Sequence, residues 1–425
     1  MGGIRNRIVK TESWREYKMS MKALLKLCLL ASIGFFSVTC SNSVKLTGNE
    51  FLIQGKISDL DDGIVITLSR IYDGEGRRIA TDTVRNGRFM FRENLESNQE
   101  QFSIFALGDG FSFGWQDIWA APRAKIKISG TGKLPPLWKV KSSVPYQKEQ
   151  NRYKNKSSDI IAELAPIVAE RSYMFAKLRA AASEDEIAAY KKIYDSLDVI
   201  SDELRVKKLY NDIFIMEKAD ITPIWISSMS AISFVVKNAN GFYDFLDTEQ
   251  AEYFREKALE LYSRMSEEDR NSYWGNYITA NLIPPRVAKV GEYMVDTYLS
   301  DVNGNIKNLV DYLGKYLLLD FWNRACAPCI AALPEMSEIA ETYRDKLTII
   351  SISLDTEIVW KEATATHNMP WINLRDPKNF GGLAASYGVT AIPNYVLISS
   401  EGIIIDKWAG YGAGFLKQKV SENIE

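Results

Sequence analysis

Two cysteines in the last third of the chain have the spacing of a redox pair. Cys326 and Cys329 enclose Ala327-Pro328 and open a stretch of helical periodicity that continues to Tyr343. Thiols three residues apart on the first turn of a helix can close a small disulfide ring and reopen it. The unpaired N–H groups and the positive end of the helix also stabilise a thiolate at the first sulfur. The spacing therefore predicts thiol–disulfide exchange.

The two thiols have different expected roles. A free thiol with a pKa of about 8.5 is only a few per cent ionised at neutral pH, and lowering the pKa to about 7 ionises half of it. Cys326 then attacks a substrate disulfide, and the less exposed Cys329 attacks Cys326 to release the reduced substrate. Pro328 suits the first helical turn, where its missing N–H would have no helical partner. A structural pair of free cysteines is the alternative interpretation.

The other cysteines and the single histidine exclude several chemistries. The chain has four cysteines and one histidine, His367. A multi-histidine metal site cannot form, and zinc at the cysteine pair would need two more ligands from Cys40 and His367 alone. We expect His367 in a loop or at the surface, without a role as a catalytic base. No metal and no bound cofactor are expected.

The composition is that of a globular protein with several domains. The chain has 425 residues, 46% hydrophobic and 25% charged, and a formal net charge of −2. The length predicts about three domains. The balanced charge gives no basis for binding nucleic acid. Four cysteines are too few for a scaffold held together by disulfides.

The first 40 residues predict an export signal. Residues 1–26 are rich in arginine and lysine, and the apolar run 27–38 is followed by Cys40. The run is shorter than the roughly 18–20 residues of a membrane span. The segment resembles a bacterial lipoprotein signal in which Cys40 becomes the lipidated first residue, although Ser37-Val38-Thr39 departs from the usual residues there. Cleavage nearby as an ordinary signal peptide is the alternative.

Export determines where the chemistry takes place. The mature chain is expected in the periplasm or cell envelope, anchored to a membrane by the lipid on Cys40. Cys28 lies inside the apolar run of the signal and has no role in the mature chain. Disulfides persist in such compartments, so the remaining cysteine pair can cycle there.

Residues 45–135 predict an antiparallel β-sandwich or small barrel. Apolar and polar residues alternate with a period of two, and Asn86-Gly87 between two strand-like flanks predicts a tight hairpin turn. The region contains no cluster of catalytic residue types. Its aromatic stretch is expected in the core, with a binding edge as the alternative: Phe111, Phe113, Trp115 and Trp119.

Residues 146–286 predict a helical region. Ser183 followed by Glu186 predicts a capping box at the start of a helix, and Asp247 with Gln250 marks a second helix start. The charged faces are expected in solvent and the aromatic stripes in the core, with binding of a partner helix as the alternative. This region predicts no chemistry of its own.

Two apolar runs frame the cysteine pair. Residues 316–321 and 347–354 are short and rich in leucine and isoleucine, which is typical of strands buried on both faces of a central sheet. A helix between them completes an α/β unit, expected over 290–425. The whole chain is therefore predicted to have an N-terminal antiparallel β domain, a helical middle region and a C-terminal α/β domain.

Residues 290–425 resemble a thioredoxin-fold domain of the TlpA/ResA type. The matching run, 320–329, contains Asp-Phe-Trp-Asn-Arg-Ala-Cys-Ala-Pro-Cys, with Pro334 further along the helix. Downstream, 389–393 and the strand 395–398 match the family's cis-proline loop, and Lys315 lies in a similar stretch. The β region resembles the β-rich domain, with no assigned chemistry, that precedes thioredoxin modules in many envelope lipoproteins. The resemblance implies a thiol-disulfide oxidoreductase acting on protein disulfides.

The resemblance also implies roles for single residues. Pro393 is expected to be cis and to face the disulfide, which leaves the Ile392 backbone available to an extended substrate. Asp320 matches the buried carboxylate of thioredoxins, and a raised pKa inside an apolar run suits a proton acceptor for Cys329. A structural carboxyl is the alternative for Asp320. The substrate-binding residues are expected to be Trp322, Ala327, Pro328 and Ile392.

Two positions depart from the family pattern. Ala325 stands where a tryptophan usually precedes the first cysteine, and Asn394 stands where threonine is common. Ala327-Pro328 also lacks the histidine with which strong oxidants over-stabilise the reduced thiolate, so a reductant or mid-range exchanger is expected. Such a protein needs an electron donor, which we expect to be a membrane thiol-relay protein.

Two other functions remain as alternatives. A thiol peroxidase would need a Thr-X-X-Cys site with a proline upstream, and Asn323-Arg324-Ala325 occupies that stretch. A non-enzymatic envelope binding protein would use the β and helical regions and carry the thioredoxin unit as a passive module. Retention of full biological function by a Cys326→Ser protein would favour the binding protein.

Overall fold

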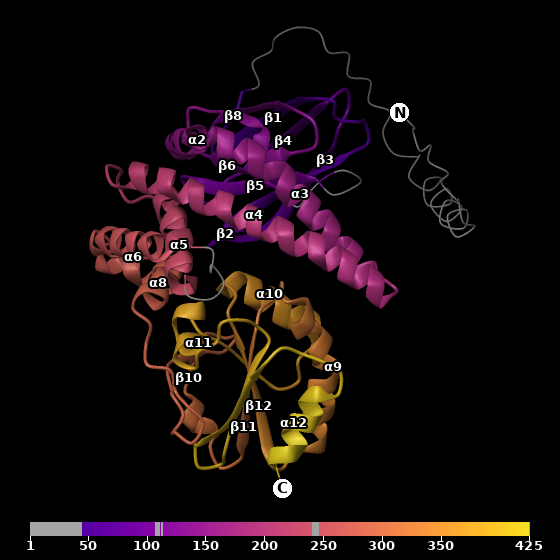
Figure 1. Ribbon diagram of the computed structural model, residues 1–425, viewed down its shortest axis with the longest axis vertical. Helices are drawn as coiled ribbons and strands as arrows, with labels where there is room; N and C mark the ends of the chain where they lie inside the picture. The colour runs from indigo at the N-terminus through magenta and orange to yellow at the C-terminus, as the bar shows by residue number, and fades with distance from the viewer. Residues whose placement is uncertain (1–44, 107–110, 112–113, 240–245, 425) are drawn as a thin grey trace, which may run out of the picture. The chain divides into compact units, whose positions relative to one another are not determined.

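The computed structural model describes residues 45–106, 111, 114–239 and 246–424. The predicted signal at 1–40, with Cys28 and Cys40, lies outside this part of the chain, and so does Phe113. From the N-terminal side, the described chain forms two four-stranded sheets, a set of helices, and a mixed sheet with helices (Figure 1). No helix in these ranges is both long enough and apolar enough to span a membrane.

The first region consists of two sheets that share one core. Its strands are β1 (Glu50–Ser58), β2 (Val65–Tyr72), β3 (Glu75–Thr83), β4 (Arg88–Asn94), β5 (Glu100–Ala106), β6 (Gln116–Ala120), β7 (Lys125–Thr131) and β8 (Lys139–Lys141). They pair in the orders β4-β1-β7-β8 and β3-β2-β5-β6. The ring of Phe51 in β1 lies 4.8 Å from that of Phe102 in β5, so the two sheets pack face to face. The alternating pattern of the sequence is explained by this arrangement.

The prediction that this region is wholly antiparallel is wrong at one strand pair. β1 and β7 run parallel, with Ile53 opposite Ile126. Between them the chain passes through the whole of the second sheet, so β7 can enter the first sheet in the same direction as β1. Alternation identifies a half-buried strand, but it does not fix the direction of its neighbour.

The turn at Asn86-Gly87 forms as predicted, but it does not join two paired strands. The φ angles of Asn86 and Gly87 are +52° and +67°, as a tight turn with two left-handed residues requires. β3 and β4 belong to different sheets, and only the bridge between Arg85 and Arg88 pairs the two flanks. The predicted hairpin is therefore a crossing from one sheet to the other.

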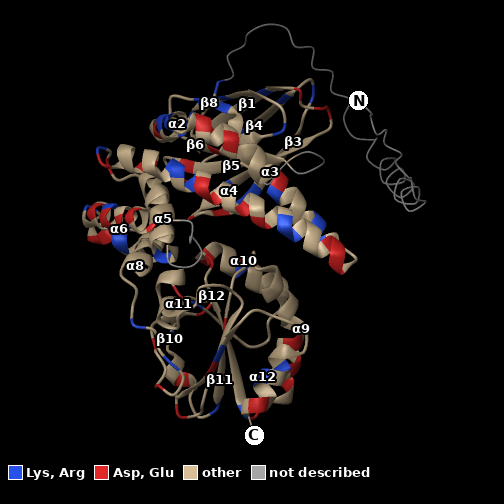
Figure 2. Ribbon diagram, in the orientation of Figure 1, with Lys and Arg blue, Asp and Glu red and all other residues tan. Residues whose placement is uncertain are grey.

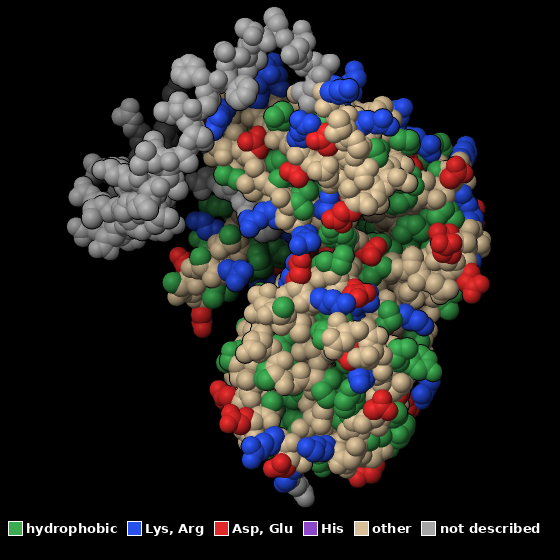
Figure 3. Space-filling view, turned by 180° about the vertical axis from the view of Figure 1, so that it is seen from behind, with side chains coloured by type: hydrophobic (Ala, Val, Ile, Leu, Met, Phe, Trp, Pro, Cys, Tyr) green, Lys and Arg blue, Asp and Glu red, His purple; other side chains and the backbone are tan. Residues whose placement is uncertain are grey.

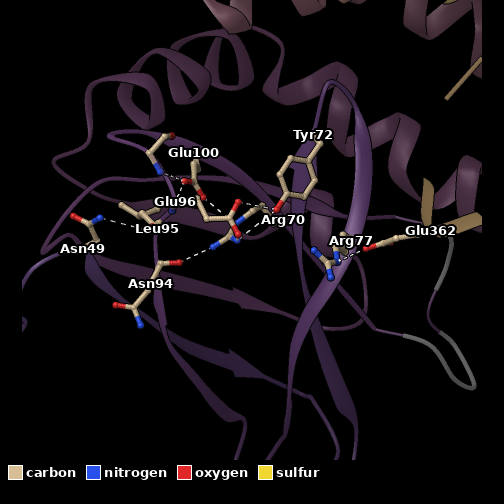
Figure 4. Close-up of polar contacts among 10 residues, drawn as sticks. Asn49, Arg70, Tyr72, Arg77, Asn94, Leu95, Glu96, Glu100 and Glu362 are labelled. Carbon is tan, nitrogen blue, oxygen red and sulfur yellow. Dashed lines mark hydrogen bonds and ion pairs between the residues drawn. The ribbon is translucent and has the colours of Figure 1, made fainter. Parts of the chain in front are cut away.

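A buried arginine fixes the connection that follows β4. Arg70 of β2 is 8% exposed and forms ion pairs with Glu96 and Glu100, the latter at 2.9 Å. Its guanidinium also donates to the carbonyl of Asn94 at 2.6 Å (Figure 4). These partners offset the free-energy cost of removing the charged guanidinium from water. They hold the 95–99 loop against the β2 strand.

The middle region is helical, as predicted. Its helices are α2 (Pro145–Lys156), α3 (Ser158–Ala180), α4 (Glu184–Met216), α5 (Pro223–Asn238), α6 (Thr248–Ser263), α7 (Glu267–Asn271) and α8 (Tyr273–Leu282). Ser183 and Asp247 are N-caps as expected, and Asp247 with Gln250 forms a full capping box. The capping box predicted at Ser183 is incomplete, because the Glu186 side chain accepts the N–H of Ala182 and not that of Ser183. Acidic and basic residues are interspersed along α3 and α4 (Figure 2).

The C-terminal region is a seven-stranded mixed sheet covered on both faces. Its strands are β9 (Leu299–Ser300), β10 (Ile306–Lys307), β11 (Tyr316–Trp322), β12 (Leu347–Ser353), β13 (Ile372–Arg375), β14 (Asn394–Ile398) and β15 (Ile404–Ala409), and its helices are α9 (Ala327–Thr342), α10 (Glu357–His367), α11 (Leu383–Ser386) and α12 (Phe415–Asn423). The sheet order is β10-β9-β13-β12-β11-β14-β15. Successive residues of β11 enter different cores, because Leu317 packs with α11 and Leu318 packs with α9 and α12.

The two predicted strands of this region are confirmed at the centre of the sheet. β11 and β12 are parallel neighbours, with Asp320 opposite Ser351. β14 lies antiparallel on the other side of β11. All residues of β11 after Tyr316 are buried, as a central strand requires. This sheet fixes where β11 ends and where α9 begins.

Packing of the two N-terminal sheets through Phe51 predicts a large loss of stability in Phe51→Ala. Removing a fully buried aromatic side chain should lower the free energy of unfolding by about 3–5 kcal/mol. Met90→Ala in β4 is the control, since Met90 is 53% exposed and should change stability by about 0.5 kcal/mol or less. Urea denaturation of both variants measures the difference. Equal effects would show that Phe51 does not lie in a shared core.

Candidate active site

The cysteine pair lies where β11 passes into α9. Cys326 is the N-cap of α9, and its sulfur accepts a hydrogen bond from the N–H of Cys329 at 3.2 Å. The two sulfurs form a disulfide. A sulfur in this position is close to the unpaired N–H groups of the first turn, which favour its ionised form. The geometry therefore suits Cys326 as the thiolate and Cys329 as its partner.

The two cysteines differ little in exposure and share an apolar surrounding. Cys326 is 9% exposed and Cys329 is 3% exposed. They pack in one cluster with further buried or half-buried side chains: Trp322, Ile330, Leu333, Trp360, Ala363, Met369, Trp371 and Ile392. Low exposure limits attack to a partner that docks on the edge of this cluster.

The predicted substrate-binding residues occupy different places. Ala327 and Pro328 are exposed beside Cys326, together with Ala325. Trp322 is only 1% exposed and lies in the apolar cluster with the cysteines, so it supports the disulfide from inside. The surface next to the disulfide is therefore formed by small side chains.

The loop before β14 approaches the same cluster. The Ile392–Pro393 peptide bond is cis, as the resemblance implied. The side chain of Ile392 packs against the cluster that contains both cysteines. Within the described ranges, no backbone hydrogen bond involves the N–H or C=O of Ile392. The backbone of Ile392 can therefore pair with an extended segment of another protein.

Asp320 is a buried carboxyl with a single close partner. It is 2% exposed, and burial raises its pKa to about 7. Ser351 donates its hydroxyl to Asp320 at 2.7 Å, and the indole N–H of Trp371 donates to the Ser351 oxygen at 2.8 Å. Trp371 also packs against the cysteine cluster. Asp320 is thus linked to the cysteine region through two side chains, and no hydrogen bond to either sulfur is present in the described part of the structure.

Sequence reasoning missed a second buried carboxyl at the site. Asp355, just beyond β12, is 2% exposed and accepts the backbone N–H of Arg324 at 2.9 Å. Ser353 donates its hydroxyl to the same carboxylate at 3.1 Å. Burial raises the pKa of Asp355, although the Arg324 N–H opposes this effect. The signal in the sequence is a Ser-X-Asp at the carboxyl end of a predicted parallel strand, where functional groups collect.

His367 and the remaining acidic groups add no metal site. His367 is the last residue of α10 and is half-buried, whereas a loop or surface position was predicted. Among the described residues, no group of three or more histidine, cysteine, aspartate or glutamate side chains is arranged to hold a metal ion. On the face seen in Figure 3, acidic and basic side chains are interspersed.

Part of this chain is similar to known proteins. A family model described as the AhpC/TSA family matches residues 290–407. The chain is 30% identical over 124 residues to the Thioredoxin-like protein YneN of Bacillus subtilis, a match that covers 28% of this chain and 71% of that protein. It is 28% identical over 124 residues to the Thiol-disulfide oxidoreductase ResA of Bacillus thuringiensis subsp. konkukian, covering 29% of this chain and 70% of that protein.

A solved structure also matches about a third of the chain. It is the thioredoxin domain of a thiol-disulfide oxidoreductase from Bacteroides vulgatus, with 27% sequence identity and a TM-score of 0.30. The match covers 32% of this chain and 97% of that one.

A mixed sheet with a cysteine pair at a helix N-terminus beside a cis-proline loop defines a thioredoxin-like thiol-disulfide oxidoreductase. The chain belongs to the AhpC/TSA family through its C-terminal third. The predicted class of enzyme is thereby confirmed.

The raised pKa of Asp320 predicts a pH-dependent difference between wild type and Asp320→Asn. The native carboxyl holds its proton up to about pH 7, whereas an unfolded aspartate releases it near pH 4, so wild-type stability falls as pH rises between these values. Asparagine has no such proton and still accepts from Ser351. The variant should therefore gain relative stability across this window, by up to about 4 kcal/mol. Denaturation of the oxidised proteins at several pH values measures it, and parallel profiles would contradict the buried carboxyl.

Proposed function

We propose that this protein reduces disulfides of other proteins in the cell envelope, with Cys326 as the attacking thiol and Cys329 as the resolving thiol. The observation that carries the proposal is the Cys326–Cys329 disulfide at the N-terminus of α9, packed against the cis Ile392–Pro393 loop. A helix terminus can hold a reactive thiolate, and an unpaired loop backbone can align an extended peptide over it.

The reaction consists of two thiol–disulfide exchanges. The Cys326 thiolate attacks one sulfur of the substrate disulfide, forms a mixed disulfide and releases the other substrate sulfur as a thiolate that takes up a proton. The Cys329 thiolate then attacks Cys326, which releases the second substrate sulfur in the same way. Two electrons pass from the enzyme dithiol to the substrate, and the Cys326–Cys329 disulfide remains. A donor dithiol, proposed to belong to a membrane thiol-relay protein, restores the reduced enzyme.

Asp320 is proposed as the proton acceptor for Cys329. The Cys329 thiol must lose a proton before it attacks, and a carboxyl with a pKa of about 7 can accept one at neutral pH. No hydrogen bond joins the two groups in the described structure, so transfer needs a water molecule or a small movement. Ser351 and Trp371 keep the carboxyl in place between cycles.

The small residues beside Cys326 suit a protein substrate. Ala325, Ala327 and Pro328 leave an open surface, which an extended segment can approach closely. The free backbone of Ile392 supplies a hydrogen-bonding edge on the other side. Substrate recognition is therefore proposed to use backbone pairing more than side-chain pockets.

The location is proposed from the N-terminal sequence. Export and lipidation at Cys40 would hold the enzyme at a membrane, where a membrane-bound thiol donor can reach it. The relatives named as thiol-disulfide oxidoreductases support the chemistry, whereas the anchor depends on the signal alone.

Cys329→Ser is expected to trap substrates on Cys326. Without the resolving thiol, the mixed disulfide cannot be released by the enzyme itself. Expression in cells that export the protein, followed by non-reducing gels and mass spectrometry, should show covalent partner proteins. Cys326→Ser is the matched control and should trap few or none. If only small-thiol adducts form on Cys326, the proposed reduction of proteins is wrong.

Cys40→Ser is expected to release the mature protein from the membrane. Loss of the lipid removes the proposed anchor, so the variant should move from the membrane fraction to the soluble fraction of the envelope. Cys28→Ser changes a thiol inside the signal and should stay with the membrane as wild type does. Fractionation followed by immunoblotting measures both. Equal distribution of the two variants would exclude lipidation at Cys40.

A further inference from the structure

The turn between β2 and β3 reaches the C-terminal region next to the thiol site. Residues from Leu46 onward form a single compact unit, which includes both parts. Asp73 and Gly74 form the turn with φ angles of +48° and +89°. A Cβ atom on Gly74 would lie 2.3 Å from the ring of Trp274 in α8, so a glycine is required by both conformation and space.

Glu75, the first residue of β3, lies at the N-terminus of α10, the helix that follows β12 in the C-terminal region. Its carboxylate accepts the hydroxyl of Thr356 at 2.9 Å and the Thr356 N–H at 3.3 Å. Thr356 is 5% exposed and is the N-cap residue of α10. A carboxylate at a helix N-terminus is electrostatically favourable. This contact joins two segments that are 281 residues apart in the sequence.

The same hairpin holds the loop that leads into Cys326. The guanidinium of Arg324 donates to the carbonyl of Gly76 at 3.2 Å, while the Arg324 backbone N–H donates to Asp355. Glu362 of α10 lies between two arginines, 3.1 Å from Arg77 and 3.7 Å from Arg324. Figure 4 shows the ion pair between Arg77 of β3 and Glu362 of α10.

We propose that the β2–β3 hairpin is part of the thiol site, and that Glu75 is a positioning residue that acts through Asp355 on the loop before Cys326. Glu75 is hydrogen-bonded to Thr356, the residue next to Asp355, and Asp355 accepts the backbone N–H of Arg324 in the loop before Cys326. The N-terminal region thus sets the ionisation of a thiol that lies in the C-terminal region. This inference rests on the proposed role of Cys326 as the attacking thiol.

The charges around the pair determine the direction of the effect. Burial and the neighbouring Asp355 raise the pKa of Glu75 to about 7, against the hydrogen bonds from Thr356. The other titratable or charged groups that face the pair are Tyr273 of α8, Asp73 of the turn, Arg375 of β13 and Arg324. As the pH rises through the pKa of Glu75, its carboxyl loses a proton and adds a negative charge beside Asp355, which disfavours a thiolate nearby.

The test compares Glu75→Gln with wild type in the full-length reduced protein. The rate of alkylation of Cys326 by iodoacetamide is measured against pH, with labelling at Cys326 read by mass spectrometry. Glutamine keeps an acceptor for Thr356 but removes the titrating charge. The acid dissociation constant of the Cys326 thiol should rise about two- to tenfold in the variant. The wild-type profile should show an inflection near neutral pH that is smaller in Glu75→Gln, whereas any contribution of Asp320 is the same in both proteins.

Glu252→Gln, on the exposed side of α6, is the control and should match wild type. Identical profiles for Glu75→Gln and wild type would overturn the inference. If the variant does not fold, Asp320→Asn decides, because it removes the other carboxyl with a pKa of about 7: a second inflection that persists in Asp320→Asn supports the inference, and a single ionisation there overturns it. Alkylation needs no substrate protein, so the two tests are independent. If Cys329→Ser traps substrates but the Glu75→Gln profile is unchanged, only this inference is wrong. If the profile changes but nothing is trapped, only the proposed function is wrong.

Discussion

The position of one sulfur at the N-terminus of α9 is the constraint on which the thiol site depends. Cys326 caps the helix and accepts the Cys329 N–H, so the helix dipole and the disulfide geometry act on the same atom. That position requires β11 to end at Trp322 and the chain to turn into α9 within a few residues. The turn is possible because β11 is a fully buried central strand with β12 and β14 on either side. The sheet therefore positions the Cys326 sulfur, which we propose as the reactive thiolate.

Three carboxyls with raised pKa values, Asp320, Asp355 and Glu75, are linked to the region of this sulfur through other residues. Asp320 lies on the sheet side, where burial raises its pKa to about 7. Asp355 and Glu75 lie on the side of the loop before Cys326, and the pKa of Glu75 is raised to the same range. Groups with pKa values near neutral exchange protons with small changes of pH. The proposed control of thiol ionisation therefore uses carboxyls and not the single histidine, which lies at the end of α10.

Local patterns in the sequence were sufficient for the elements that carry the thiols. The runs at 316–321 and 347–354 and the cysteine spacing each depend on neighbouring residues, and the corresponding strands and helix are present. The cis bond at Pro393 was expected from the family resemblance, and it is present as well. The parallel pairing of β1 with β7 and the crossing at Asn86-Gly87 depend on long-range topology, which alternation does not encode. The same limit applies to the Glu75–Thr356 contact, because its two partners are 281 residues apart. Asp355 could have been predicted from the sequence, because a Ser-X-Asp stands at the end of the predicted strand.

The most direct test of this account is the acid dissociation of the Cys326 thiol in the reduced protein, followed by the ultraviolet absorbance of the thiolate during a pH titration. Cys326→Ser supplies the baseline that leaves the other thiols. The account predicts a pKa for Cys326 clearly below the value of about 8.5 for a free thiol, because α9 stabilises the anion. A pKa at or above that value would contradict it, since the helix terminus would then not activate the sulfur.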